Sequence, residues 1–215
     1  MNKISAVIFD LDGTLANTLP LCIQAFRQSV EPLVQRSISD AEIIATFGPS
    51  EEGTIMALAP GYYDKGVEDY LHYYEDLHDM CPVAFDGIRE LLENLKKDGV
   101  RIAMVTGKGK HSTDISLRYF ALTHFFEFIE TGSPNGPRKA EGIQMILDKW
   151  KDLPKNEVIY VGDAPSDIIA SKKVGIPVVG AAWAETAEPE KLIELEPDAI
   201  FYSVEKFATW VEQRI

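Results

Sequence analysis

The sequence predicts an α/β fold, in which a parallel sheet is covered by helices and is interrupted by a helical insertion. Residues 4–9 form a short apolar run with the length and β-branched content of a buried strand. Residues 16–84 show helical spacing and no convincing strand, whereas helices and strands alternate from Asp86 onward. Such alternation implies a parallel sheet with helices on both faces.

The helical insertion separates the first strand from the rest of the core. Its helical patterns lie at residues 19–36, at the capping-box sequence 39–42 and at residues 67–77. Because the insertion offers no strand, residues 4–9 must pair with later strands to satisfy their backbone groups. We therefore expect a core of residues 1–15 and 85–215, with residues 16–84 as a helical cap that covers the sheet edge as a lid.

The alternating part of the chain supplies the remaining strands and their helices. An apolar helical stripe at residues 88–95 ends at Gly99, and residues 101–106 form a short apolar strand. Further strands are expected at residues 126–129, 157–161, 177–180 and 199–202. Helical stripes are expected at residues 143–150, 168–174 and 207–211.

Charge and cysteine content restrict the partners and the compartment. The 215 residues include 34 acids and 21 bases, and the net charge of -13 disfavours nucleic acid and anionic membranes as partners. The insertion alone holds 11 acids and 3 bases. Cys22 and Cys81 lack metal-ligand spacing, and no uncharged run reaches the roughly 18 residues of a membrane span. We expect a cytoplasmic protein with reduced thiols, as a monomer or weak homodimer.

The first strand ends in the sequence Asp10-Leu11-Asp12-Gly13-Thr14. In open α/β sheets, ligands bind beyond the carboxyl ends of the strands, so these carboxylates lie where chemistry is usually done. A calcium loop of the EF-hand type does not fit, because the sixth position is Leu15 and the twelfth is Leu21. An ordinary turn is the remaining structural alternative, and the buried strand before it favours a functional site.

Three later segments bring further polar residues to the same edge. Thr106 and Gly107 follow one strand, Lys139 precedes a helix, and Asp163 and Asp167 follow another strand. Carboxylates 4 Å apart repel by very roughly 4 kcal/mol per pair at an effective dielectric near 20, so the acids need a cation or protonation. Oxygen ligands alone favour Mg²⁺.

This set of groups is typical of phosphoryl transfer. Mg²⁺ and the ammonium of Lys139 would together compensate the charge of a phosphate and of its nucleophile. Thr106 and the backbone amides after Asp12 would hold phosphate oxygens.

In this order, the motifs resemble those of haloacid dehalogenase superfamily hydrolases, in the phosphatase branch with a helical cap between the first two motifs. The matching positions are Asp10-Leu11-Asp12-Gly13-Thr14, Thr106, Lys139 and Gly162-Asp163 through Asp167. The match covers essentially the whole chain and is most similar to phosphoglycolate phosphatase-like and pyrophosphatase-like members. It implies a Rossmann-like parallel sheet core with an inserted α-helical cap domain.

The resemblance also implies an activity and roles for residues. It implies a Mg²⁺-dependent phosphatase of small phosphorylated metabolites, with phosphoglycolate as a candidate, in which Asp10 is the nucleophile that forms an aspartyl-phosphate. Asp12 protonates the leaving oxygen and then activates water. Mg²⁺ would be held by Asp10, the backbone carbonyl of Asp12 and Asp163, with Asp167 acting through water or orienting the other ligands. The implied phosphate-binding residues are Thr106, Gly107 and Lys139.

Three alternative functions remain open, and the chain departs from the family pattern at two positions. A sugar phosphomutase or a pyrophosphatase would use the same groups, and a non-catalytic binding or regulatory protein could share the scaffold. Ala140 follows Lys139 where the family usually has proline, so Arg138 is an alternative cation. Asn17 stands where the family often has aspartate.

Three further sequence patterns give no clear evidence of a catalytic or binding role. Residues 107–112 lack the third glycine of a dinucleotide loop, and we expect Lys108 and Lys110 to be solvated or peripheral to the phosphate. The four histidines lack zinc-site spacing, which favours surface or packing roles. The loop around Gly48-Pro49 is either an interhelical turn or a cap loop that faces the site.

Overall fold

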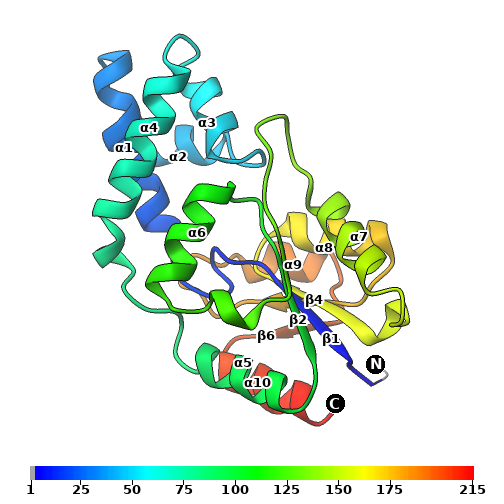
Figure 1. Cartoon of the computed structure of the whole chain (residues 1–215). Helices are drawn as coiled ribbons and strands as arrows, with labels where there is room; N and C mark the ends of the chain where they lie inside the picture. The colour runs from blue at the N-terminus through cyan, green and yellow to red at the C-terminus, as the bar shows by residue number, and fades with distance from the viewer. Residues whose placement is uncertain (1–2) are drawn as a thin grey trace.

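A computed structural model describes residues 3–215 and contains a six-stranded, fully parallel sheet (Figure 1). Its strands are β1 (Ala6–Phe9), β2 (Arg101–Val105), β3 (Phe128–Glu130), β4 (Val158–Gly162), β5 (Val178–Ala181) and β6 (Ala199–Phe201). The order across the sheet is β3-β2-β1-β4-β5-β6, so the direction of winding reverses between β1 and β4. Such a switch point is where doubly wound sheets bind their ligands.

The predicted α/β class is confirmed, and each predicted strand is present within two residues of its expected bounds. The first strand begins at Ala6 rather than at residue 4, because the amide of Ile4 donates to the carbonyl of Arg214 at 2.6 Å. Ile4 therefore pairs with the C-terminal segment before the sheet ladder begins.

Helices cover both faces of the sheet because both faces are apolar. The helices that follow the insertion are α5 (Ile88–Lys97), α6 (Lys110–Tyr119), α7 (Lys139–Lys149), α8 (Pro165–Val174), α9 (Pro189–Glu194) and α10 (Val204–Glu212). Short 3₁₀ turns occur at η1 (His78–Met80), η2 (Thr123–Phe125) and η3 (Lys155–Glu157). Val7 and Phe9 of β1 join the core formed with α5 and α10, whereas Ala6 and Ile8 join the core formed with α7 and α8. This alternation follows from the period of two in a strand.

The inserted segment contains the four cap helices, α1 (Leu19–Val34), α2 (Asp40–Ile44), α3 (Glu51–Leu58) and α4 (Tyr63–Asp76). Helices α1 and α4 lie side by side (Figure 1), and the rings of Phe26 and Tyr70 are 4.3 Å apart between them. Ser39 forms the predicted capping box at α2. The two ends of the inserted segment lie close together, because the amide of Phe85 donates to the carbonyl of Leu15 at 2.9 Å. Within residues 3–215, no helix combines the length and the apolar character needed to cross a membrane.

Candidate active site

The candidate site lies at the switch point between β1 and β4. Asp10 follows β1, Asp163 follows β4, and Asp167 lies in the first turn of α8. Lys139 is the first residue of α7 and reaches the same place from the other side of β1. The topology therefore brings together side chains that are up to 157 positions apart, as the sequence predicted.

Lys139 connects two buried carboxylates. Its Nζ lies 2.5 Å from Asp10 Oδ2 and 2.5 Å from Asp167 Oδ1. Burial alone would lower the pKa of Lys139, but the attraction of Asp10 and Asp167 raises it above its usual value, so the side chain is an ammonium. Burial raises the pKa of Asp10 to about 6, although the Lys139 ammonium opposes this shift.

Arg138, the alternative cation, points elsewhere. Its guanidinium donates to the carbonyl of Thr131 at 2.9 Å and pairs with Glu141 at 3.4 Å. No ion pair joins it to the Asp10 cluster within the described part of the chain. The structure therefore places Lys139, and not Arg138, at the acids.

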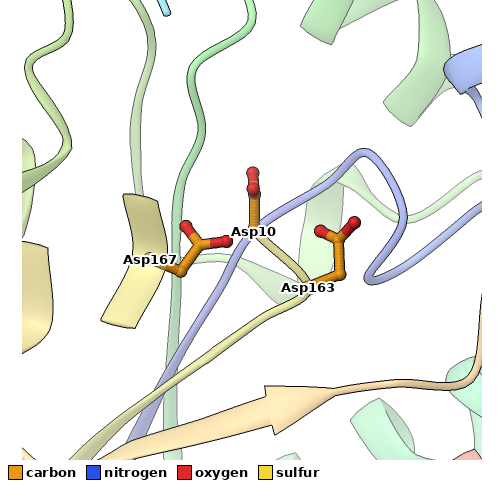
Figure 2. Close-up of side chains that lie close together, drawn as sticks. All are labelled: Asp10, Asp163 and Asp167. Carbon is orange, nitrogen blue, oxygen red and sulfur yellow. The ribbon is translucent and has the colours of Figure 1, made fainter. Parts of the chain in front are cut away.

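Asp163 completes an acidic cluster. Asp10, Asp163 and Asp167 each offer a carboxylate oxygen, and these oxygens lie within 4.8 Å of one another (Figure 2). Thr14 Oγ1 donates to Asp163 Oδ1 at 3.1 Å. Burial, followed by repulsion from Asp10 and Asp167, raises the pKa of Asp163 well above its usual range. The carboxylate form is thus unfavourable there unless a further positive charge is present.

The chemistry of this cluster fits Mg²⁺. Three carboxylates face one ammonium, so a divalent cation would compensate the remaining charge, and oxygen donors suit Mg²⁺. Asp167 is already engaged by Lys139, by Tyr160 Oη at 3.0 Å and by the amide of Ala164 at 2.9 Å. Asp10 and Asp163 therefore have more free lone pairs for a cation than Asp167 has.

Gly13 is required by the close approach of the first loop to Asp163. Its φ is +72°, in the left-handed region, and a Cβ at this position would lie 2.0 Å from Asp163 Oδ2. Only glycine allows both the turn and this contact.

Thr106 and Gly107, two of the predicted phosphate-binding residues, follow strand β2. Thr106 is buried at the end of β2, and its Oγ1 accepts a hydrogen bond from the amide of Lys108 at 3.2 Å. A Cβ on Gly107 would lie 3.7 Å from Lys139 Cε. Thr106 and Gly107 thus lie on the same edge of the sheet as the acids.

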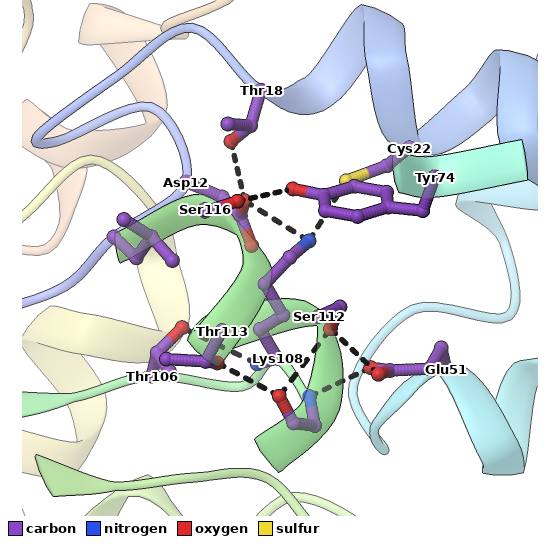
Figure 3. A network of polar contacts seen from close by, with 12 residues as sticks. Asp12, Thr18, Cys22, Glu51, Tyr74, Thr106, Lys108, Ser112, Thr113 and Ser116 are labelled. Atoms are coloured by element: carbon purple, nitrogen blue, oxygen red, sulfur yellow. Dashed lines mark hydrogen bonds and ion pairs between the residues drawn. The ribbon is translucent and has the colours of Figure 1, made fainter. Parts of the chain in front are cut away.

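The side chain of Asp12 lies apart from the acidic cluster. Its Oδ1 accepts a hydrogen bond from Thr18 Oγ1 and lies 3.3 Å from Lys108 Nζ (Figure 3). Asp12 is absent from the cluster formed by Asp10, Asp163 and Asp167. Its side chain is directed toward the cap helices. Asp12 could therefore share a cation with Asp10 and Asp163 only through its backbone carbonyl.

Of the two alternatives predicted for Lys108, solvated or peripheral to the phosphate, the structure contradicts the first. Lys108 is only 6% exposed, its Nζ donates to Cys22 Sγ at 3.1 Å, and it lies 4.3 Å from the centre of the Tyr74 ring. Burial would lower the pKa of Lys108, but Asp12 raises it well above its usual value. Local sequence could not reveal this, because the cover comes from α1 and α4. Lys110 is exposed and pairs with Asp114 at 2.5 Å, as expected for a solvated residue.

The cap also contacts the core through Glu51, which ends the loop around Gly48-Pro49 and for which the sequence predicted no contact of its own. Glu51 is 5% exposed and accepts hydrogen bonds from the amide of Gly109 and from Ser112 Oγ, both at 2.6 Å (Figure 3). The amide of the neighbouring Ser50 donates to the carbonyl of Ser133 at 2.9 Å. The loop around Gly48-Pro49 therefore leads into a direct contact with the core and is more than an interhelical turn.

One of the four histidines has a packing role. His78 is buried and stacks on Tyr119 with ring centroids 4.1 Å apart, which confirms packing for this histidine. Cys22 and Cys81 are free thiols.

Comparison with known proteins finds a family model and similar sequences. The family model described as haloacid dehalogenase-like hydrolase matches residues 7–181. Pyrophosphatase PpaX from Bacillus pumilus is 31% identical over 199 residues, covering 92% of this chain and 91% of that protein. Pyrophosphatase PpaX from Anoxybacillus flavithermus is 28% identical and covers 91% of each chain.

Solved structures show the same architecture. A haloacid dehalogenase-like family hydrolase from Streptococcus pneumoniae has a TM-score of 0.75 and 25% identity, covering 96% of this chain and 98% of its own. A predicted phosphoglycolate phosphatase from Haemophilus somnus has a TM-score of 0.77 at 22% identity, covering 96% of this chain and 99% of its own, and this likeness concerns the fold alone.

Proposed function

The chain belongs to the haloacid dehalogenase-like hydrolase family, and from this membership we propose that it is a Mg²⁺-dependent phosphatase of small phosphomonoesters. The observation that carries the proposal is the position of the Lys139 ammonium, 2.5 Å from Asp10 and 2.5 Å from Asp167, beside Asp163. A nucleophilic carboxylate, a fixed cation and an oxygen-lined place for a metal are the groups that phosphoryl transfer through a covalent intermediate requires.

Asp10 is the proposed nucleophile. Its carboxylate is held through both oxygens, by Lys139 at Oδ2 and by the amide of Leu11 at Oδ1, at 2.7 Å. One of these oxygens attacks phosphorus, and the bond from phosphorus to the leaving oxygen breaks. The carboxyl proton of Asp12 passes to that leaving oxygen, which completes the transfer to an aspartyl-phosphate.

The second step reverses the role of Asp12. Its carboxylate takes a proton from a water molecule that attacks the phosphorus of the aspartyl-phosphate. The bond between phosphorus and Asp10 breaks, so inorganic phosphate leaves and both acids are restored. Mg²⁺, when held by Asp10, Asp163 and the carbonyl of Asp12, supplies positive charge that makes the phosphate a better electrophile.

Thr106, Gly107 and Lys139 are the proposed phosphate-binding groups. The hydroxyl of Thr106 and the amide of Gly107 follow β2, and the Lys139 side chain approaches Gly107 while its ammonium contacts Asp10. Donors fixed in this way stabilise the charge that builds up on the transferred oxygens.

The acidic cap favours a small substrate. With 11 acids and 3 bases in residues 16–84, a leaving group with several negative charges would be repelled. Phosphoglycolate-like monoesters satisfy this condition. Pyrophosphate is the second candidate, and the 31% identity to a Bacillus pumilus pyrophosphatase favours it.

Turnover of p-nitrophenyl phosphate by the purified protein, with Mg²⁺ and with excess chelator, tests the proposal. We expect hydrolysis that requires Mg²⁺, and its absence would contradict the proposed function and favour a binding protein. A panel that includes phosphoglycolate and pyrophosphate, compared by kcat/KM, then decides between the two candidates.

A further inference from the structure

Lys108 is a buried cation that the two proposed steps do not use. It follows Gly107 in the loop after β2, but its side chain extends away from the phosphate-binding groups toward the cap helices (Figure 3). The Lys108 side chain is 3% exposed. An ammonium is rarely buried to this degree without a specific partner, because removing it from water is costly.

Asp12 is that partner. Among the described residues, it is the only acid whose carboxylate lies within 4.0 Å of Lys108 Nζ, at 3.3 Å. The other neighbours of the ammonium belong to the cap: Cys22 Sγ on α1 at 3.1 Å and the ring of Tyr74 on α4 at 4.3 Å. A thiol is a weak acceptor and an aromatic face attracts a cation without neutralising it, so the cap fixes the ammonium but does not replace the carboxylate.

The two oxygens of Asp12 are in different situations. Oδ1 receives the hydroxyl of Thr18 and faces the ammonium of Lys108, whereas Oδ2 has no hydrogen-bond partner in residues 3–215. A hydrogen bond and an ion pair at the same oxygen restrict rotation of the carboxyl group. The other oxygen is thereby left free for a reacting group.

We propose that Lys108 is a positioning residue for Asp12, which holds Oδ1 so that Oδ2 is presented to the leaving oxygen and later to water. The inference rests on the proposed function. Because Cys22 and Tyr74 hold the ammonium from the cap side, Asp12 is correctly oriented only when α1 and α4 are seated on the core. Lys108 thus connects closure of the cap to proton transfer.

The test compares two leaving groups in the holoenzyme with Mg²⁺. An alkoxide needs a proton to leave, whereas p-nitrophenolate leaves without one, so only the alkyl ester depends on Asp12 in the first step. The substitution is Lys108→Met, which keeps an unbranched side chain, one atom shorter, and removes its charge. We expect kcat/KM for glycerol 2-phosphate to fall by about 100-fold and that for p-nitrophenyl phosphate by less than about fivefold.

A second measurement distinguishes a loss of Asp12 positioning from a non-specific distortion of the active site. The second step uses Asp12 with every substrate, so kcat for p-nitrophenyl phosphate should fall more than kcat/KM wherever that step limits turnover. The inhibition constant of inorganic phosphate should stay within about twofold, because Thr106, Gly107 and Lys139 are unchanged.

Lys110→Met is the matched control, since Lys110 is two residues away and its side chain is 71% exposed. It should leave both substrates unaffected. If Lys108→Met does not fold, Thr18→Val tests the same fixation of Asp12, because it removes the hydroxyl that donates to Oδ1 and should give the same selective loss on the alkyl ester.

If Lys108→Met lowers kcat/KM equally for the two substrates, or lowers neither, the positioning role of Lys108 is overturned. The proposed function would stand, because the enzyme remains active. Wild-type protein that hydrolyses neither substrate with Mg²⁺ would overturn the proposed function and this role with it.

Discussion

At the scale of single residues, the central contact is the ammonium of Lys139 between two acids, each 2.5 Å away. Lys139→Met would leave these carboxylates without their cation. We expect kcat to fall by about 10³-fold or more, because a fixed charge at the transferred phosphate is lost. Arg138→Met is the adjacent control and should change kcat by less than about threefold, since Arg138 contacts Thr131 and Glu141 instead. Similar losses for both variants would contradict the assignment.

The ionisation of Asp10 predicts how Mg²⁺ binding depends on pH. Burial raises its pKa from 3.8 to about 6 in the metal-free protein. Between these values the folded chain holds a proton that the unfolded chain has released, so Asp10 stabilises the fold less as the pH rises through this window.

Mg²⁺ requires the carboxylate form, so its binding must displace this proton below about pH 6. We expect calorimetric titration to show an affinity about fivefold higher at pH 6 than at pH 5, with protons released into the buffer. An affinity for Mg²⁺ that is the same at both pH values would contradict the assignment of the buried Asp10 carboxylate as a metal ligand.

At the scale of elements, α3 and α6 hold the cap on the core. Glu51, at the start of α3, accepts from the amide of Gly109 and the hydroxyl of Ser112 at the start of α6. A carboxylate is favoured there because the first amides of a helix are unpaired and its dipole is positive at this end. This contact therefore gives a specific link between two elements that are distant in sequence.

Glu51→Ala should loosen that link. An amide donor left without its partner costs about 1–3 kcal/mol, so we expect faster hydrogen exchange at residues 109–112 and a KM raised several-fold. Glu52→Ala is the neighbouring control, because Glu52 contacts Ser50 within its own segment. Unchanged exchange in the Glu51 variant would show that this contact does not seat the cap.

At the scale of the whole molecule, the site exists because the winding of the sheet reverses between β1 and β4. Alternating patterns predicted the strands within two residues, and the rule that ligands bind beyond the carboxyl ends of strands predicted that Asp10, Lys139, Asp163 and Asp167 would meet. These predictions succeeded because they depend on local periodicity and on the direction of parallel strands.

The sequence failed where a contact depends on how distant segments pack. The burial of Lys108 and the docking of Glu51 both join residues more than 50 positions apart, and neither leaves a local pattern. The choice between Arg138 and Lys139 depends on the rotation of α7 at its first turn, which adjacent residues cannot reveal.

The most direct test of the account is the rate of Asp10→Asn with p-nitrophenyl phosphate and Mg²⁺, measured beside its melting temperature. The substitution removes the proposed nucleophile and also a buried charge, so we expect kcat to fall by about 10⁴-fold or more while the melting temperature holds or rises. A folded Asp10→Asn variant with a rate within about tenfold of the wild type would contradict the account, because the aspartyl-phosphate could not form.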